Sequence, residues 1–350
     1  MLKWQSSASL ETLRARADFL RRIRDFFHVR DILEVETPLL DFSSTTDPHI
    51  RSVEIHESAV FLSASTAKYN PKYKQGKLYL QTSPEFAMKR LLAFGTGSIY
   101  QICKAFRAGE SGTRHNPEFS ILEWYRIGFK LEDLMQEVLE FLTEIFNFKK
   151  TKVQRTNHRL SYLNYAALFL ETHAIDPHQV ELEVLGAKAK QLGLDTAWIE
   201  SDPHLEADKD IWLDYLFSTT IQPYLGLECP VCVWGFPASQ AALSKINAQG
   251  VAERFEVFYK GLELGNGYHE LQNAQEQALR FDRDNKKRLG TGKPMIPKDE
   301  RLLGALQKGL PACSGVALGL DRILMLSLGL SSLQEVLAFP LVRGDSWEQF

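Results

Sequence analysis

Residues 106–125 read Phe-Arg-Ala-Gly-Glu-Ser-Gly-Thr-Arg-His-Asn-Pro-Glu-Phe-Ser-Ile-Leu-Glu-Trp-Tyr, and they are the most informative stretch of the chain. Apolar runs precede and follow a centre rich in glycine and charge, which predicts two strands joined by a charged loop. Arg107, Arg114 and His115 could bind a polyphosphate, because a guanidinium donates two parallel hydrogen bonds to phosphate oxygens. Taken singly, each of these side chains also fits the solvated tip of an ordinary hairpin.

Outward from this stretch, the spacing of apolar residues predicts the other elements. We expect helices over 8–28, 131–146 and 273–289, and extended segments over 32–38, 77–81, 98–106, 120–125 and 251–264. Ser83-Pro84 is typical of a helix start, and 315–328 of a strand that becomes a helix at Gly319. Residues 150–228 are less regular and are interpreted as a helical insertion. The simplest organisation is a single α+β domain over 1–350.

The composition restricts the partners that we expect. The 350 residues include 41 basic and 44 acidic side chains, and the net charge is −3, which argues against nucleic acid as the main partner. The sequence shows neither a signal peptide nor an apolar run long enough to span a membrane, so we expect a cytoplasmic protein. Cys229-Pro-Val-Cys232 could be a redox or zinc motif, but a lone pair within an apolar run favours buried strand residues.

A second informative stretch is 261–270, which reads Gly-Leu-Glu-Leu-Gly-Asn-Gly-Tyr-His-Glu. Glu263 and Glu270 bracket its glycine-rich centre, which we interpret as a turn. Two carboxylates brought close together repel each other and need a cation or a proton between them. Mg²⁺ suits such a place beside a nucleotide, because it binds one or two carboxylates together with phosphates. A surface hairpin without a metal explains this stretch equally well.

The third stretch is 315–322, which reads Gly-Val-Ala-Leu-Gly-Leu-Asp-Arg. Gly315 and Gly319 would let a flat ligand approach the backbone, and Arg322 in the following helix could reach the same ligand. The spacing matches neither the dinucleotide-binding motif nor the P-loop. Close packing of a helix on a strand is the other interpretation.

Together and in this order, these stretches resemble the signature motifs of the class II aminoacyl-tRNA synthetases. The helix over 8–28 with Val35-Glu-Thr-Pro38 is similar to motif 1, which forms the dimer, 106–125 to motif 2 and 315–322 to motif 3. The lysyl subgroup is the most similar, with its hallmarks at Ser83-Pro-Glu85, His115-Asn-Pro-Glu-Phe119, Glu123-Trp-Tyr125 and Glu263-Leu-Gly-Asn-Gly267. The resemblance covers the chain except 150–228. It implies an α+β catalytic domain, an antiparallel sheet flanked by helices, and a homodimer.

The resemblance also implies roles for individual residues. Arg107 would stabilise the α-phosphate of ATP, and Arg322 would contact the γ-phosphate and stack on adenine opposite Phe119. The implied ATP site comprises Arg107, Gly109, Glu110, His115, Asn116, Phe119, Glu263, Leu264, Gly319 and Arg322. A lysine-like substrate would be bound by Ser83, Pro84, Glu85, Glu123, Tyr125, Glu270 and Ala317. Glu263 and Glu270 would hold Mg²⁺.

Three departures from the lysyl-tRNA synthetases are informative. The motif 1 helix begins by about residue 10, so we expect no anticodon-binding domain. Ala317 replaces a glycine of motif 3, and residues 306–319 are similar to the elongation factor P–lysine ligases, which attach (R)-β-lysine to a lysine of elongation factor P. One methyl group in an amino-acid pocket shifts preference by roughly 1–3 kcal/mol, so Ala317 could select the β-amino acid. In motif 2, Gly109 occupies the usual glutamate position, and either Glu110 or the Gly109 backbone would meet adenine.

These features together lead us to expect ATP-dependent activation of lysine or β-lysine and transfer to elongation factor P. We expect no stable nucleic-acid partner and no membrane association. A truncated lysyl-tRNA synthetase and a non-catalytic regulatory paralogue are the alternatives. A non-catalytic paralogue usually loses its phosphate-binding residues, whereas Arg107, Glu263, Glu270 and Arg322 are all present.

Overall fold

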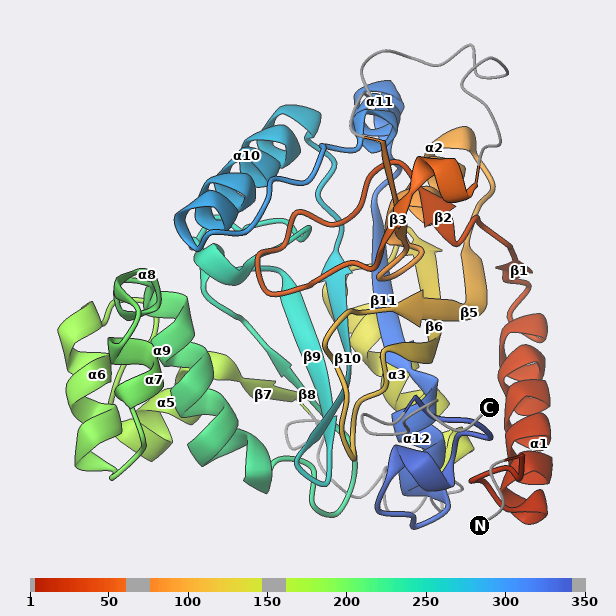
Figure 1. Ribbon diagram of the computed structural model, residues 1–350, viewed down its shortest axis with the longest axis horizontal. Helices are drawn as coiled ribbons and strands as arrows, with labels where there is room; N and C mark the ends of the chain where they lie inside the picture. The colour runs from red at the N-terminus through yellow and green to blue at the C-terminus, as the bar shows by residue number, and fades with distance from the viewer. Residues whose placement is uncertain (1–3, 61–75, 147–161, 342–350) are drawn as a thin grey trace. The chain divides into compact units, whose positions relative to one another are not determined.

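The computed structural model describes residues 4–60, 76–146 and 162–341 (Figure 1). Its contacts divide the chain into two compact units, and each is described by itself. Unit 1 consists of Met1–Ile127, Gln272–Pro311 and Ala317–Phe350, and unit 2 of Gly128–Leu271 and Ala312–Val316. None of the helices in the described ranges is long and apolar enough to cross a membrane.

Unit 1 combines short and long strands with a group of helices. Its strands are β1 (Leu33–Glu34), β2 (Leu40–Asp41), β3 (Glu54–His56), β4 (Lys77–Leu80), β5 (Ile99–Phe106) and β6 (Glu118–Ile127). Its helices include α1 (Leu10–His28), α2 (Glu85–Phe94), α10 (Ala274–Gly290), α11 (Glu300–Gly309) and α12 (Leu320–Ser327). Strands β5 and β6 pair antiparallel along their length, β1 pairs with β5 in parallel, and β2 and β3 pair antiparallel with β4.

Helix α1 packs against β5 and β6 through aromatic side chains. The helix begins after Ser9, whose hydroxyl accepts a hydrogen bond from the backbone N–H of Thr12 at 3.0 Å and so caps the first turn. The buried Phe27 ring stacks on Tyr100 at 4.2 Å and meets Trp124 edge-on at 5.4 Å. Aromatic contacts of this kind combine a large buried area with a preferred geometry, so they fix the position of α1 on the strands.

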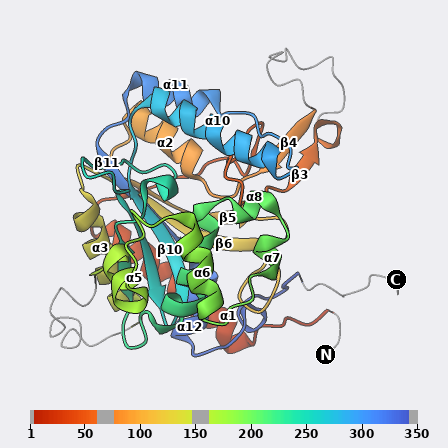
Figure 2. The same cartoon turned by 90° about the vertical axis from the view of Figure 1, so that its left-hand side faces the viewer.

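Helices α2, α10 and α11 lie together in unit 1 (Figure 2). The rings of Phe86 on α2 and Phe281 on α10 lie 5.8 Å apart. Helix α10 is capped by the carboxamide of Asn273 and α11 by the carboxylate of Asp299. Each side chain accepts hydrogen bonds from backbone N–H groups of the first turn. Helix α2 begins at Glu85 with Pro84 as the capping residue, one position later than the expected Ser83 cap.

Unit 2 combines a series of paired strands with helices of different lengths. Its strands are β7 (Tyr162–Asn164), β8 (Val231–Trp234), β9 (Arg254–Tyr259) and β10 (Leu262–His269). Its helices include α3 (Leu131–Ile145), α5 (Tyr165–His173), α6 (Leu182–Gln191), α7 (Ala197–Glu200), α8 (Pro203–Glu206) and α9 (Lys209–Leu216). Strands β8, β9 and β10 pair antiparallel, and β7 joins β8 in parallel.

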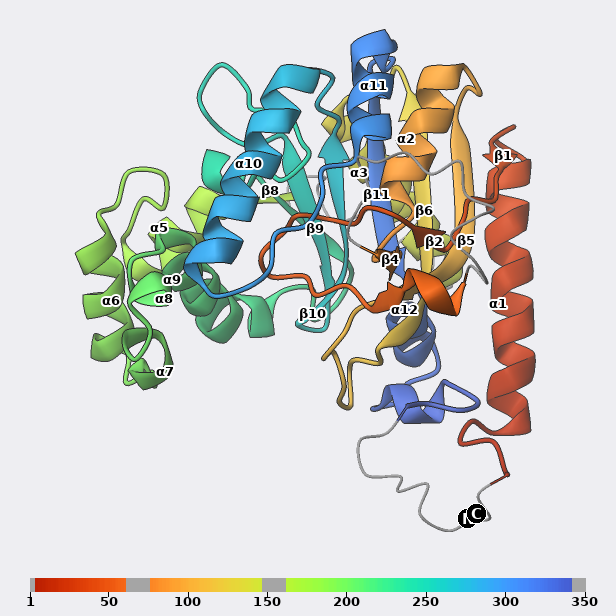
Figure 3. The same ribbon diagram turned by 45° about the horizontal axis from the view of Figure 1, so that its top comes forward.

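Helices α5–α9 lie within the expected helical insertion (Figure 3). Its core is aromatic, and the ring of Tyr165 lies 5.2 Å from Phe217 and 4.7 Å from Phe236. Residues 165–216 of the predicted insertion contain these helices, residues 150–161 lie outside the described residues, and the insertion itself stays a prediction. Strand β11 (Cys313–Gly319) follows later in the chain, with Cys313–Val316 in unit 2 and the rest in unit 1.

The hairpin of β9 and β10 corrects two predictions. Residues 251–264 are not one strand, because the chain turns at Lys260 and Gly261, whose φ angles are 51° and 69°. Two consecutive positive φ angles are typical of the tight hairpin turn that matches the twist of the strands. The glycine-rich centre of 261–270 is therefore part of β10 and forms no turn. The prediction of buried strand residues at the paired cysteines is confirmed for Cys232 on β8 and not for the half-buried Cys229.

Candidate functional site

Arg107 directly follows β5 in unit 1, and its guanidinium is held among the residues that motif 2 predicts. The guanidinium carbon lies 5.2 Å from the centre of the Phe119 ring, and Nη1 lies 3.8 Å from Glu110 Oε1. Its Nε is buried and has no hydrogen-bond partner within the described part of the chain. A buried, unsatisfied donor is costly in a folded protein, and here it is suited to an anionic ligand.

The backbone at Gly109 explains the unusual order of residues in motif 2. Its φ angle of 86° lies in the left-handed region that favours glycine. The side chain that reaches toward Arg107 then belongs to Glu110. The structure therefore favours Glu110 as the acidic neighbour of Arg107, one position later than in the synthetases that this stretch resembles.

The loop after Gly109 is attached to two segments near the C-terminal end of unit 1. Arg322 Nη2 lies 2.6 Å from His115 Nε2, and Arg322 Nε donates to the carbonyl oxygen of Arg114 at 3.2 Å. The backbone N–H of Leu333 donates to the carbonyl oxygen of Thr113 at 2.8 Å. His115 and Arg322 were both expected to bind ATP. The fold brings them together although they are far apart in sequence.

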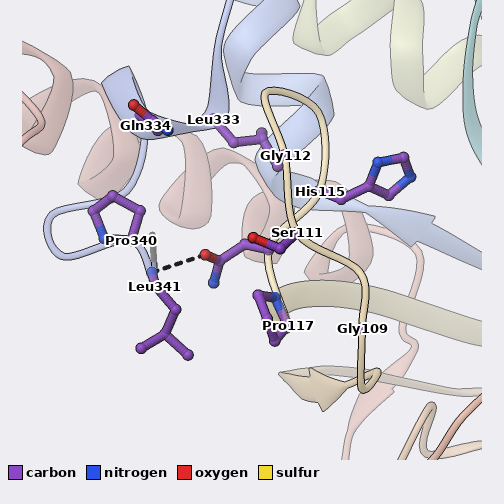
Figure 4. Close-up of a pocket in the computed structure, with 10 residues that line it drawn as sticks. Gly109, Ser111, Gly112, His115, Pro117, Leu333, Gln334, Pro340 and Leu341 are labelled. Atoms are coloured by element: carbon purple, nitrogen blue, oxygen red, sulfur yellow. Dashed lines mark hydrogen bonds between the residues drawn. The ribbon is translucent and has the colours of Figure 1, made fainter. Parts of the chain in front are cut away.

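Asn116 holds the same loop to the chain beyond α12 at Leu341, which Figure 4 shows beside the loop. Its Oδ1 accepts from the backbone N–H of Leu341 at 2.9 Å, and its Nδ2 donates to the carbonyl oxygen of Glu118 at 2.5 Å. The amide is therefore engaged within the protein in this structure. Next to it lies a cavity of about 550 Å³, lined by Gly109, Ser111, Gly112, His115, Asn116, Pro117, Leu333, Gln334, Pro340 and Leu341.

Glu123 and Tyr125 form a buried acidic pair on β6. The Tyr125 hydroxyl donates to Glu123 Oε1 at 2.7 Å, and Glu123 is 2% exposed. Alternate strand residues share a face, which explains why the motif spacing brings the two together. Burial, with the charge of Glu123 nearby, raises the pKa of the Cys103 thiol to about 12. The surroundings of this carboxylate are thus poorly solvated, which suits binding of an ammonium group.

Glu85 is paired with a lysine that sequence reasoning missed. Lys89 Nζ donates to Glu85 Oε1 at 2.6 Å, and Lys89 is 2% exposed. The spacing of four residues on a helix was the available signal. Ser83 lies beside them, and its hydroxyl accepts from the backbone N–H of Glu85 at 3.4 Å.

Gln101 is a second residue that the sequence did not single out. It lies opposite Glu123 in the register of β5 and β6 and is 1% exposed. Thr37 in the motif 1 stretch donates to Gln101 Oε1 at 3.0 Å, which fixes the amide. No local pattern marks such a residue, because only strand pairing places it beside Glu123.

The β9–β10 hairpin of unit 2 gathers polar side chains on one face. Its register pairs Glu263 with Phe258, then shifts at a bulge, and pairs Asn266 with Glu256. Glu263 shares a face with Glu256 because its partner Phe258 is two residues from Glu256, and the bulge brings Asn266 to the same face although its odd spacing from Glu263 would otherwise separate them. Leu264 is buried within this region.

Glu256 is the carboxylate that sequence reasoning missed here. Burial raises its pKa, the guanidinium of Arg254 opposes that effect, and the nearby charge of Glu263 adds to it. Arg254 Nη2 donates to Glu256 Oε1 at 2.5 Å. Glu256 and Glu263 are neighbours across the strands, so a cation beside them would relieve their repulsion.

Glu270 lies at the far end of β10 from Glu263 and corrects the expected metal pair. A strand rises about 3.3 Å per residue, which separates the two backbones by roughly 20 Å. Because β10 is extended between them, one Mg²⁺ shared by Glu263 and Glu270 is incompatible with this structure. Glu270 is 1% exposed, and its backbone N–H donates to the carbonyl oxygen of Cys313 at 3.0 Å.

The remaining motif 3 residues lie where the strand ends. Ala317 is half-buried in β11, and Gly319 is the residue at which β11 becomes α12. Arg322 follows in the first turn of α12, as expected. The predicted transition from strand to helix at Gly319 is confirmed.

A model of the family described as tRNA synthetases class II (D, K and N) matches residues 1–343. The chain belongs to this family. Similar proteins include the Elongation factor P--(R)-beta-lysine ligases of Pasteurella multocida, 46% identical over 97% of both chains, and of Proteus mirabilis, 44% identical over 97% of this chain and 98% of the other. The protein of that name from Vibrio atlanticus is 43% identical over 97% of this chain and 98% of its own.

Membership of the class II synthetase family confirms the expected fold. The long pairs β5–β6 and β9–β10, each within one unit, are antiparallel, whereas β1 with β5 and β7 with β8 pair in parallel. The synthetase motifs identified by resemblance lie on β5–β6 and on the β11–α12 transition. Family membership shows the fold and does not by itself assign a role to each residue. The role of each residue is therefore argued from its own contacts.

Proposed function

We propose that this protein activates (R)-β-lysine with ATP and transfers it to the ε-amine of a lysine on elongation factor P. The proposal rests on the relatives of that name, which are 43–46% identical over nearly the whole chain. The Glu123–Tyr125 pair on β6 and the buried Nε of Arg107 support it, because the reaction needs an ammonium site and a phosphate site.

Arg107 is proposed to stabilise the charge that builds on the α-phosphate as the carboxylate of β-lysine attacks. Its buried Nε supports this role, because a donor already oriented and desolvated costs no reorganisation during the reaction. Arg322, His115 and Glu110 are proposed to complete the contacts to ATP. The leaving group is pyrophosphate, and the product is an aminoacyl-adenylate.

Mg²⁺ is proposed to bind at Glu263, with Glu256 as the second carboxylate. The cross-strand placement of the two and the raised pKa of Glu256 fit a divalent cation. The metal would neutralise charge on the phosphate oxygens of ATP. Glu270 is proposed as a contact of the substrate ammonium.

The substrate amines are proposed to meet two sets of carboxylates. Glu123 and Tyr125 would bind the distal amine, and Glu85 with Ser83 would bind the amine near the reacting end. In the second step the acceptor lysine amine attacks the adenylate carbonyl, an amide bond forms, and AMP leaves. Because the amine is itself the nucleophile, this step needs no nucleophilic side chain from the enzyme.

We also propose that the protein forms a homodimer through α1. The same proposal includes a cytoplasmic location and no stable nucleic-acid partner. Exposed apolar side chains on and after α1 support the dimer, since Leu10 is 64% and Val29 74% exposed. Apolar side chains that are exposed in one chain are common where two subunits meet.

The experiment that tests the function is ATP–pyrophosphate exchange followed by transfer of label. We expect exchange with (R)-β-lysine to exceed exchange with α-lysine, and labelled β-lysine to appear on elongation factor P and not on tRNA. Elongation factor P with its acceptor lysine changed to arginine is the control and should stay unlabelled. Labelling of tRNA would support a truncated synthetase, and no exchange with either substrate would support a non-catalytic paralogue.

A further inference from the structure

A buried carboxylate, Asp321, joins three segments of unit 1 that are far apart in sequence. Its side chain is 3% exposed. Oδ1 accepts from Arg16 Nη2 at 2.6 Å, and Oδ2 accepts from the backbone N–H of Ser120 at 2.7 Å. Both oxygens are thus paired, one with a cation from α1 and one with an amide from β6, as a buried carboxylate requires.

Asp321 directly precedes Arg322 in the first turn of α12. The N-terminal end of a helix favours negative charge and disfavours positive charge, so Asp321 compensates for its neighbour. The Arg322 side chain extends from this turn to His115 and the carbonyl oxygen of Arg114. One short turn is therefore anchored by Asp321 and presents Arg322 to the phosphate-binding loop.

Ser120 connects the same carboxylate to the other proposed phosphate ligand. It follows Phe119, and the Phe119 ring lies 5.2 Å from the guanidinium of Arg107. Holding the backbone at Ser120 therefore fixes the strand position that supports this ring. On the opposite side, Arg16 Nη2 also lies 3.4 Å from the carbonyl oxygen of Val336, so the guanidinium is held by two acceptors.

We propose that the Arg16–Asp321 ion pair is a positioning device for Arg107 and Arg322, and that it sets the affinity of the protein for ATP. The inference rests on the proposed function of these two arginines and extends it to Arg16 and Asp321, to which the resemblance assigned no role. Arg16 and Asp321 act through Ser120 and through the first turn of α12 and do not touch ATP themselves. Displacing a phosphate ligand by about 1 Å can reduce a rate by about 10²-fold.

The test measures ATP binding by calorimetry and ATP–pyrophosphate exchange for Arg16→Met, Arg16→Lys and Asp321→Asn. We expect Arg16→Met and Asp321→Asn to weaken ATP binding by about tenfold or more, a typical size for coupling between sites. Arg16→Lys keeps the charge and should recover most of the loss. The KM for β-lysine should change little, because Glu123 and Tyr125 do not depend on this pair. If Arg16→Met does not fold, the comparison of Arg16→Lys with Asp321→Asn gives the same answer.

Arg21→Met is the matched control, since Arg21 lies on the same helix in an exposed ion pair with Asp18 and should leave ATP binding unchanged. A merely structural role would lower the melting temperature of the Arg16 and Asp321 variants while leaving ATP affinity and exchange kinetics at the wild-type level, and that result would overturn the proposal. A wild-type protein that binds ATP without exchange would refute the proposed function alone. A wild-type protein that binds no ATP would refute both.

Discussion

Arg107 combines a buried Nε donor with the ring of Phe119 and the carboxylate of Glu110. An unsatisfied buried donor costs about 1–3 kcal/mol, so the folded protein gains little stability from this side chain. A residue retained at a cost to stability is expected to be needed for binding or chemistry.

Arg107→Ala should therefore abolish adenylate formation and leave the fold intact. Loss of one such donor reduces a rate by about 10²–10³-fold, and we expect ATP–pyrophosphate exchange to fall at least that far. The melting temperature should stay close to that of the wild type. Lys104→Ala is the control, because Lys104 lies on β5 in an exposed pair with Glu118 and should keep its exchange activity. An active Arg107→Ala variant would contradict the assignment.

The methyl group of Ala317 is proposed to select β-lysine, and its removal tests this role. Ala317→Gly should raise kcat/KM for α-lysine relative to (R)-β-lysine, because the methyl group is proposed to select the position of the reacting amine. The shift corresponds to roughly 1–3 kcal/mol in the ratio. The measurement is exchange with each amino acid, with the KM for ATP as the internal control. An unchanged ratio would refute the selector.

The β9–β10 hairpin depends on the close approach of two strands at Gly267. A Cβ added there would lie 2.4 Å from Phe255 Cε1 and 3.1 Å from the carbonyl oxygen of Gly315, both in unit 2. Gly267→Ala should destabilise the protein by about 1–3 kcal/mol through overpacking, measured by thermal unfolding. Gly304→Ala on α11 is the control, since its added Cβ would meet no atom within 4 Å among the described residues apart from its chain neighbours and its own helix backbone. That variant should be neutral or slightly stabilised, because alanine favours a helix over glycine.

The helical insertion contains a histidine that makes its stability depend on pH. His173 ends α5, and its Nε2 lies 2.9 Å from Thr220 Oγ1. Burial, with the positive charge of Lys188, lowers the pKa of His173 from 6.5. The neutral ring is thus favoured in the folded state, so its stabilising effect is complete above about pH 6.5 and is lost as the pH falls through the lowered folded pKa.

His173→Gln should accordingly reduce the loss of stability between neutral and mildly acidic pH. The measurement is the melting temperature of both proteins across that range. His204→Gln is the comparison, because His204 is exposed in the same insertion. If the melting temperatures of the wild type and His173→Gln change with pH in the same way, His173 does not contribute to the pH dependence of stability.

At the scale of the whole molecule, the open question is how many chains assemble. We predict a twofold symmetric dimer through α1, because such dimers are the commonest oligomers. Two exposed apolar side chains also lie near the C-terminal end of this helix, Val29 directly after it and Leu33 in β1. Light scattering should give twice the mass of one chain. Val29→Asp should reduce it to one chain, whereas Leu289→Asp, at an exposed site on α10, should not. A monomeric wild type would count against the dimer.

The single-domain organisation over 1–350 remains a prediction. The two units of this structure are each compact, and the proposed ATP ligands are divided between them, with Arg107 and Arg322 in unit 1 and Glu263 in unit 2.

Much of the fold and part of the site follow from the sequence by itself. The periodicity of apolar residues predicted α1, α3 and α10 closely, and the motifs predicted β5, β6 and the change from β11 to α12. Local patterns suffice here because helix and strand periods, caps and motif spacing are properties of neighbouring residues. The pairing of Glu123 with Tyr125 was accessible for the same reason.

The tertiary structure decided the features that depend on register and on contacts distant in sequence. The register of β9 and β10 places Glu263 on the same face as Glu256, the bulge brings Asn266 to that face, and the extended strand separates Glu263 from Glu270. The effect of the bulge could not be read from a local pattern, because one inserted residue reverses the face of a strand. Asp321 binds Arg16, which lies 305 positions away in the sequence. The residue types of the motifs were therefore recognisable from neighbouring residues in the sequence. The partners that orient these side chains were decided by the tertiary structure, because they come from distant parts of the chain.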